Sequence, residues 1–228
     1  MVTMSATSRP QVHDRAAAAR DSWLHAPRGA PVTQADLEAT PWYGRHVEAI
    51  DGNVHVTPFT AAERDDLPDD GRRHELLDGT LIMSPAPTRR HQAIVVELLY
   101  LLRSACPEHL RVLVAPTDVE LNESSTVEPD LFVSRREDLD AAHPSLPLLV
   151  VEVMSPSTRR IDRGHKKDAY ERAGIPDYWI VDPDELTVTA WQLDASGVYR
   201  EVARATGDET FTAIAPFDIA FTPAELIR

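Results

Sequence analysis

The chain has 228 residues, of which 43% are hydrophobic, and a formal net charge of −14 at pH 7. Its single cysteine, Cys106, excludes an intramolecular disulfide and a cysteine-rich zinc site, and it fits a reducing, cytoplasmic location. No apolar run approaches the ~20 residues of a membrane-spanning helix, so we expect no membrane partner. The acidic charge argues against general coating of nucleic acid, because phosphate neutralisation needs Lys and Arg.

Residues 1–57 are rich in Ala, Pro, Arg and His and have little periodicity. We expect an N-terminal extension that is poorly ordered or loosely docked, with some helix near residues 34–39. The compact domain is expected to span residues 58–228. It begins with a capping box, because Thr60 precedes Glu63 by three residues.

The rest of the domain alternates between strands and helices. A hairpin is predicted at Asp78-Gly79, and an amphipathic helix runs from its N-cap Thr88 to Pro107. LRVLVAP, TDVELN and EPDLFVS read as strands, and LPLLVVEVMS, the most apolar one, is expected at the centre of the sheet. A helix from Asp162 to about residue 173 and further strands follow. This order predicts an α/β (α+β) fold, a mixed β-sheet flanked by helices.

Two acidic residues stand at apolar strands. Glu152 lies on the strand face that alternation assigns to Leu148, Val150 and Met154. A buried carboxylate is costly unless it is paired or bound to a metal, so an ion pair and a metal site are both open. Asp130 begins the strand PDLFVS, where it fits either a solvated strand end or an oxygen ligand of Mg²⁺.

The helix that begins at Asp162 supplies a cation. Lys166 shares its inner face with Tyr170, whereas Lys167 falls on the polar face. Asp162 precedes Lys166 by four residues and can pair with it. The alternative is a lysine whose stem lies on the sheet and whose ammonium is in water.

Glu75 and His91 lie further upstream. Glu75, in the first hairpin strand, could equally be an exposed strand residue, and His91, on the apolar face of the long helix, could be a core histidine. With Asp130, Glu152 and Lys166, however, they form a set of carboxylates, histidine and lysine. Such a set suits metal-assisted phosphodiester hydrolysis.

The segments RHELLDGTLIMSPAP, VEPDLFV and LLVVEVMSPSTRRIDRGHKKDAYERAGIPDYWIVDP occur in this order between about Phe59 and the end of the chain. In these segments the chain resembles the PD-(D/E)XK nuclease superfamily. More narrowly, it resembles the Uma-two-type family of bacterial restriction endonucleases. The resemblance covers roughly three quarters of the chain.

The resemblance implies a four- to five-stranded mixed sheet in a restriction-endonuclease-like core. It also implies Mg²⁺, for which Mn²⁺ can substitute, bound by Asp130, Glu152 and the backbone carbonyl of Val153. Met154 stands where the usual lysine would follow the acid, and Lys166 matches the family's lysine on the next helix.

Three further residues match the family's motifs. Glu75 matches the acid of an opening YELIDG-like motif, although His74 replaces the usual aromatic residue. His91 matches a family histidine, and Tyr170 matches a recurrent tyrosine. We expect Glu75 and His91 to belong to the catalytic set.

Three functions remain open. The first is a metal-dependent endonuclease acting on DNA, in which arginine pairs at 72–73, 89–90, 135–136 and 159–160 line a phosphate path. The second is an inactive binding or assembly module, for instance a homodimer paired through the strand TVTAWQL. The third is a metal phosphohydrolase acting on small nucleotides. Binding of Mg²⁺ or Mn²⁺ separates the second from the other two.

Overall fold

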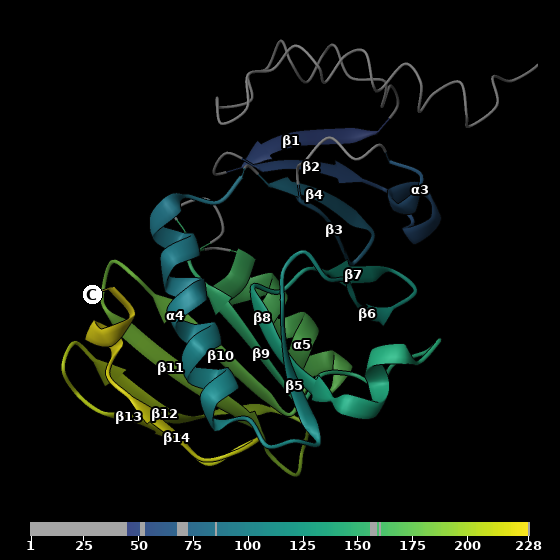
Figure 1. The fold of residues 1–228 in the computed structure, drawn as a ribbon. Helices are drawn as coiled ribbons and strands as arrows, with labels where there is room; N and C mark the ends of the chain where they lie inside the picture. The colour runs from purple at the N-terminus through teal and green to yellow at the C-terminus, as the bar shows by residue number, and fades with distance from the viewer. Residues whose placement is uncertain are drawn as a thin grey trace, which may run out of the picture.

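The computed structural model describes residues 45–50, 53–67, 73–84, 86–155, 159 and 161–227. This part of the chain contains two six-stranded sheets, and Figure 1 shows the first sheet above the second. The predicted helix near residues 34–39 lies outside the described residues.

The first sheet is antiparallel throughout and has the order β1-β2-β4-β3-β7-β6. Its strands are β1 (His46–Ile50), β2 (Asn53–Thr57), β3 (Arg73–Leu77), β4 (Thr80–Ser84), β6 (Val119–Asn122) and β7 (Ser125–Val127). Strands β1 and β2 fall within the expected N-terminal extension, and the pairing of β2 with β4 buries Val54 and Val56. This part of the extension is therefore held by backbone hydrogen bonds. The sequence contains a hairpin signal that the prediction overlooked, an Asp51-Gly52 dipeptide between two alternating runs.

The second sheet is mixed and has the order β12-β11-β10-β9-β8-β5, in which only β9 and β10 are parallel. Its strands are β5 (Leu110–Val114), β8 (Leu131–Arg135), β9 (Leu149–Val153), β10 (Asp177–Asp182), β11 (Thr187–Leu193) and β12 (Tyr199–Thr206). The predicted mixed fold is confirmed, and β9 has a central place. The sheet has six strands rather than four or five, and β11 is paired on both edges, so the suggestion that TVTAWQL pairs across a dimer is wrong.

Helices cover the two faces of the second sheet (Figure 1). On one face, α4 (Arg89–Ala105) packs on Val151 and Val153, and on the other, α5 (Lys167–Ala173) packs on Val150. Because side chains alternate along β9, Glu152 faces the same side as Val150, toward α5. The remaining elements are α3 (Ala61–Asp65), η1 (Arg136–Asp140), the π-helical turn η2 (Ile161–Lys166), the hairpin β13 (Phe211–Ala213) with β14 (Ile219–Phe221), and η3 (Pro223–Ile227).

Local signals set the ends of several elements. Thr60 and Glu63 form the predicted capping box of α3, and the Thr88 hydroxyl accepts a hydrogen bond from the backbone of His91 at the start of α4. Gly174 ends α5 in the left-handed conformation, with φ 85°. Among the described residues, no helix is long and apolar enough to cross a bilayer.

Candidate active site

Strands β8 and β9 bring Asp130 and Glu152 together. Leu131 is paired with Val151, so one step further along the two antiparallel strands Asp130 comes opposite Glu152. The backbone N–H of Val153 donates a hydrogen bond of 2.9 Å to Oδ2 of Asp130. Both carboxylates are buried, at 3% exposure for Asp130 and 1% for Glu152. Asp130 is therefore not a solvated strand end.

Lys166, the last residue of η2, lies inside the molecule. Its Nζ is 3.0 Å from Oε1 of Glu152 and 2.7 Å from Oε1 of Glu75, and its exposure is 1%. The Tyr170 hydroxyl donates a hydrogen bond of 2.8 Å to the same oxygen of Glu152. Lys167 lies outside, with its Nζ 5.2 Å from the ring centre of Trp191. The two lysines thus point in the directions that the helix pattern predicts.

Glu75 is buried rather than exposed, because the first sheet lies against the end of the second sheet at this point. Besides its ion pair with Lys166, its Oε1 accepts a hydrogen bond of 2.8 Å from the backbone of Glu128. Asp162 is also buried, and its Oδ1 lies 3.9 Å from Lys166. One ammonium therefore faces three carboxylates.

His91, in the first turn of α4, reaches the same place from the opposite face of the sheet. Its Nε2 is 3.1 Å from Oδ2 of Asp130 and 2.9 Å from the carbonyl oxygen of Val153. Because both neighbours are acceptors, Nε2 carries the hydrogen. Burial lowers the pKa of His91, but the hydrogen bond and the charge of Asp130 outweigh it, and the pKa is raised overall. The other ring nitrogen, Nδ1, is buried and has no hydrogen-bond partner in the described structure.

Arg73 is a member of the cluster that the sequence pattern did not single out. Its Nη2 donates a hydrogen bond of 2.8 Å to Oδ1 of Asp130. The available signal was strand alternation, because Arg73 and Glu75 are two residues apart in β3 and share a face. Arg73 was expected only as part of a phosphate path.

The two acids differ in electrostatic environment. Burial raises the pKa of Asp130, but the hydrogen bond of His91 and the charge of Arg73 outweigh it and hold the pKa well below its usual range. Burial raises the pKa of Glu152, and the nearby Asp130 and Glu75 raise it further, so that Lys166 compensates only in part. Burial lowers the pKa of Lys166, yet Glu152, Glu75 and Asp162 together raise it above its usual range. Lys166 is therefore a permanent cation.

The oxygen atoms of this cluster are of the kind that a hard divalent cation prefers, namely the carboxylates of Asp130 and Glu152 and the carbonyl of Val153. Four buried carboxylates, those of Glu75, Asp130, Glu152 and Asp162, lie in the cluster with the cations Arg73 and Lys166. Within the described parts of the chain, however, no three His, Cys, Asp or Glu side chains are grouped as ligands of one ion. Both oxygens of Asp130, Oε1 of Glu152 and the carbonyl of Val153 instead lie within hydrogen-bond distance of donors of the protein.

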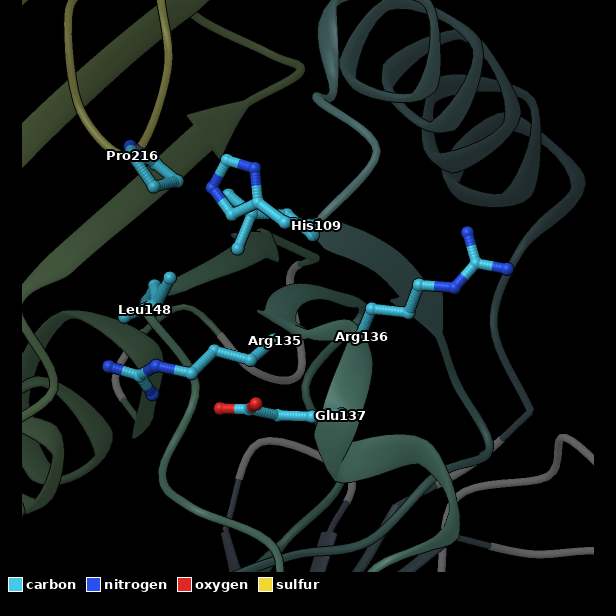
Figure 2. Close-up of a pocket in the computed structure, with 7 residues that line it drawn as sticks. His109, Arg135, Arg136, Glu137, Leu148 and Pro216 are labelled. Atoms are coloured by element: carbon cyan, nitrogen blue, oxygen red, sulfur yellow. The ribbon is translucent and has the colours of Figure 1, made fainter.

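A separate pocket of about 570 Å³ lies at the other end of the second sheet. Figure 2 shows Arg135 and Glu137 extending in one direction and Arg136 in the opposite one. Arg135 ends β8, whereas Asp130 immediately precedes that strand, so this pocket is distinct from the acidic cluster. It is lined by His109, Leu110, Arg135, Arg136, Glu137, Leu148 and Pro216.

Comparison with known proteins identifies the family. A search of curated proteins gives no match. Among solved structures, the chain is similar to the crystal structure of a putative nuclease belonging to DUF820 from Anabaena variabilis ATCC 29413, with a TM-score of 0.60 and 19% identity over 75% of this chain and 98% of that one. This similarity supports the fold. The model of the Uma2 family, described as putative restriction endonuclease, matches residues 61–224. The chain therefore belongs to the Uma2 family of restriction-endonuclease-like proteins.

Proposed function

We propose that the protein is a metal-dependent endonuclease that hydrolyses phosphodiester bonds, with DNA as its substrate. The observation that carries this proposal is the cluster in which Asp130 and Glu152, from paired strands, share one buried site with Lys166. Family membership supports a nuclease. The carboxylate oxygens of Asp130 and Glu152 and the carbonyl of Val153 support a divalent cation, Mg²⁺ or Mn²⁺, because hard cations prefer oxygen ligands.

In this proposal Asp130, Glu152 and the carbonyl of Val153 hold the metal. When bound, the metal would activate water and offset phosphate charge. Lys166 supplies a fixed positive charge that stabilises the negative charge developing on the phosphate. Glu75 keeps the ammonium of Lys166 in place through its 2.7 Å contact.

Two further side chains orient the acids. His91 bridges Asp130 and the Val153 carbonyl and so fixes the distance between two of the proposed ligands. The Tyr170 hydroxyl donates a hydrogen bond to Glu152 and restricts the rotation of that carboxylate. Burial raises the pKa of Tyr170 well above its usual value, so this hydroxyl remains a donor.

The test is cleavage of supercoiled plasmid in Mg²⁺, in Mn²⁺ and in EDTA, by the wild type and by Asp130→Asn, Glu152→Gln and Lys166→Met. We expect metal-dependent nicking by the wild type and a loss of at least about 100-fold in each variant. Asp218→Asn removes an exposed acid far along the chain and is the charge-matched control, which should retain activity.

The same samples separate the alternatives. Cleavage of RNA or of small nucleotides without plasmid nicking would keep the metal site and replace DNA as the substrate. Nicking that persists in Glu152→Gln and Asp130→Asn would reject this site. Absence of hydrolysis on all substrates would favour an inactive binding module.

A further inference from the structure

Asp130 has no carboxylate oxygen left without a protein donor. Oδ1 accepts from Nη2 of Arg73 at 2.8 Å. Oδ2 accepts from the backbone of Val153 at 2.9 Å and lies 3.1 Å from Nε2 of His91. The carbonyl of Val153, a second proposed metal ligand, is also engaged by His91. A metal ion that binds here meets donors that already hold its ligands.

Arg73 is the permanent cation that forms an ion pair with Asp130. Within the described structure, Lys166 forms ion pairs with Glu75, Glu152 and Asp162 and none with Asp130. The side chain of Arg73 is only 18% exposed, and its one ion pair in the described structure is with Asp130. Burial lowers the pKa of Arg73, but the charges of Asp130, Glu75 and Glu152 outweigh it, so the guanidinium stays charged. Asp130 thus has a guanidinium at the carboxylate to which the family resemblance assigns a metal.

Binding of a guanidinium and a divalent cation to the same buried carboxylate carries a large electrostatic free-energy cost. Like charges a few ångströms apart repel strongly where water is excluded. Removal of the guanidinium from Asp130 relieves this repulsion and frees Oδ1 as a ligand. In the metal-free protein, by contrast, the same guanidinium prevents Asp130 from being a buried, uncompensated charge.

We infer that Arg73 is the internal counter-ion that a divalent metal has to displace from Asp130, and that Arg73 thereby sets the metal affinity of the site. The inference rests on the proposed metal-dependent function. Arg73 acts through Asp130, so it is a positioning residue. It holds Asp130 in the metal-free protein and competes with the metal for it.

The test compares Mn²⁺ binding by calorimetry in the wild type, Arg73→Gln and Arg73→Lys. We expect Arg73→Gln to bind Mn²⁺ about tenfold more tightly or better, because the competing charge is gone. Arg73→Lys should give a smaller increase, since lysine keeps the charge but loses the planar guanidinium contact. Arg172→Gln removes an exposed arginine that is paired with Asp78, and its Mn²⁺ affinity should equal that of the wild type.

Melting temperature gives a second readout that a purely structural role would not reproduce. In EDTA, Arg73→Gln should melt at a lower temperature than the wild type, because Asp130 has lost its counter-ion. In Mn²⁺ the difference in melting temperature between the two proteins should become smaller or change sign. Combining Arg73→Gln with Asp130→Asn should recover part of the loss in EDTA and abolish the gain from Mn²⁺.

The outcomes show whether Arg73 competes with the metal for Asp130 or helps the site to bind the metal. Weaker or unchanged Mn²⁺ binding in Arg73→Gln overturns the inference, and the proposed function stands if the wild type still binds and cleaves. Binding by Arg73→Gln when the wild type binds nothing supports the inference in its strongest form. If neither protein binds Mn²⁺, both the inference and the proposed function fail. If Arg73→Gln does not fold, the smaller increase expected of Arg73→Lys carries the test.

Discussion

At the scale of single residues, the two adjacent lysines of the η2–α5 segment have opposite environments. Lys166 is 1% exposed and lies between Glu75 and Glu152, whereas Lys167 lies over the ring of Trp191. Loss of the first leaves two acids buried without their cation. Loss of the second removes a contact at the surface.

We therefore predict that Lys166→Met lowers the free energy of unfolding in EDTA by about 3–5 kcal/mol. The matched variant Lys167→Met should cost less than about 1 kcal/mol. Urea unfolding followed by circular dichroism measures both. Equal losses in the two variants would contradict the burial of Lys166 between the acids.

Asp177, at the start of β10, predicts a dependence of stability on pH. Its side chain is buried, and burial raises its pKa to about 6, although a hydrogen bond from Gln192 opposes this shift. Between about pH 4 and pH 6 the folded chain therefore binds a proton that the unfolded chain releases. Stability contributed by this group is present at low pH and is lost as the pH rises through 6.

Asp177→Asn keeps an acceptor for Gln192 and cannot ionise. At pH 7 we expect the variant to be more stable than the wild type by about 1–2 kcal/mol, after allowing for solvent screening. At pH 4 the two proteins should unfold at the same denaturant concentration. A difference that does not change with pH would show that the ionisation of Asp177 is not its cause.

The chemistry of single residues was predictable where it follows from local pattern. Alternation in β9 and the helix face of Lys166 were read from spacing alone. The partner of Asp130 was not predictable in this way, because Arg73 lies 57 positions away in another sheet. Spacing shows which side chains share a face, whereas which of them meet depends on how the sheets pack.

At the scale of elements, the β3–β4 hairpin shows how a turn fixes register. Asp78 and Gly79 both have positive φ, at 49° and 73°, and the strands on either side pair from Leu77↔Thr80 to Arg73↔Ser84. This turn sets the position of Arg73 and Glu75 relative to Asp130 and Lys166. Correct register matters here because a slip of one residue would turn both side chains to the other face.

Gly79→Ala should lower the free energy of unfolding by about 1–2 kcal/mol, because a Cβ is strained at this φ. The nearest atom to that Cβ would be the carbonyl oxygen of Phe59 at 3.7 Å, so strain rather than a clash is the cause. The opposite is expected of Gly164→Ala in η2, where a Cβ meets nothing within 4 Å, with a gain of about 0.5–1 kcal/mol. Thermal unfolding of the two variants measures both changes. A loss of stability in both variants would contradict the prediction that they differ in sign.

Elements with strong local signals were predicted well. The caps at Thr60 and Thr88, the Asp78-Gly79 turn and the stop at Gly174 lie where the sequence indicates. The π-helical geometry of η2 was not predicted, because the spacing of apolar residues was interpreted with the ordinary α-helical period. The division into two sheets was not predicted either, since strand pairing is set by distant parts of the chain.

At the scale of the whole molecule, the net charge of −14 complicates any measurement of metal binding. An acidic surface collects divalent cations as counter-ions without a built site. At a specific site, by contrast, the metal binds only the folded chain. It then stabilises the fold by an amount that depends on the affinity of the site. Global stability therefore separates the buried cluster from the surface charge.

We predict that Mn²⁺ at about 100 times its dissociation constant adds roughly 2.7 kcal/mol to the stability of the wild type. For a chain of this size the melting temperature should rise by about 5–10 °C. Glu152→Gln should lose this rise, whereas Asp218→Asn, which removes the same unit of charge from an exposed position, should keep it. An equal rise in all three proteins would assign the effect to the acidic surface, since only a site containing Glu152 can distinguish the two variants.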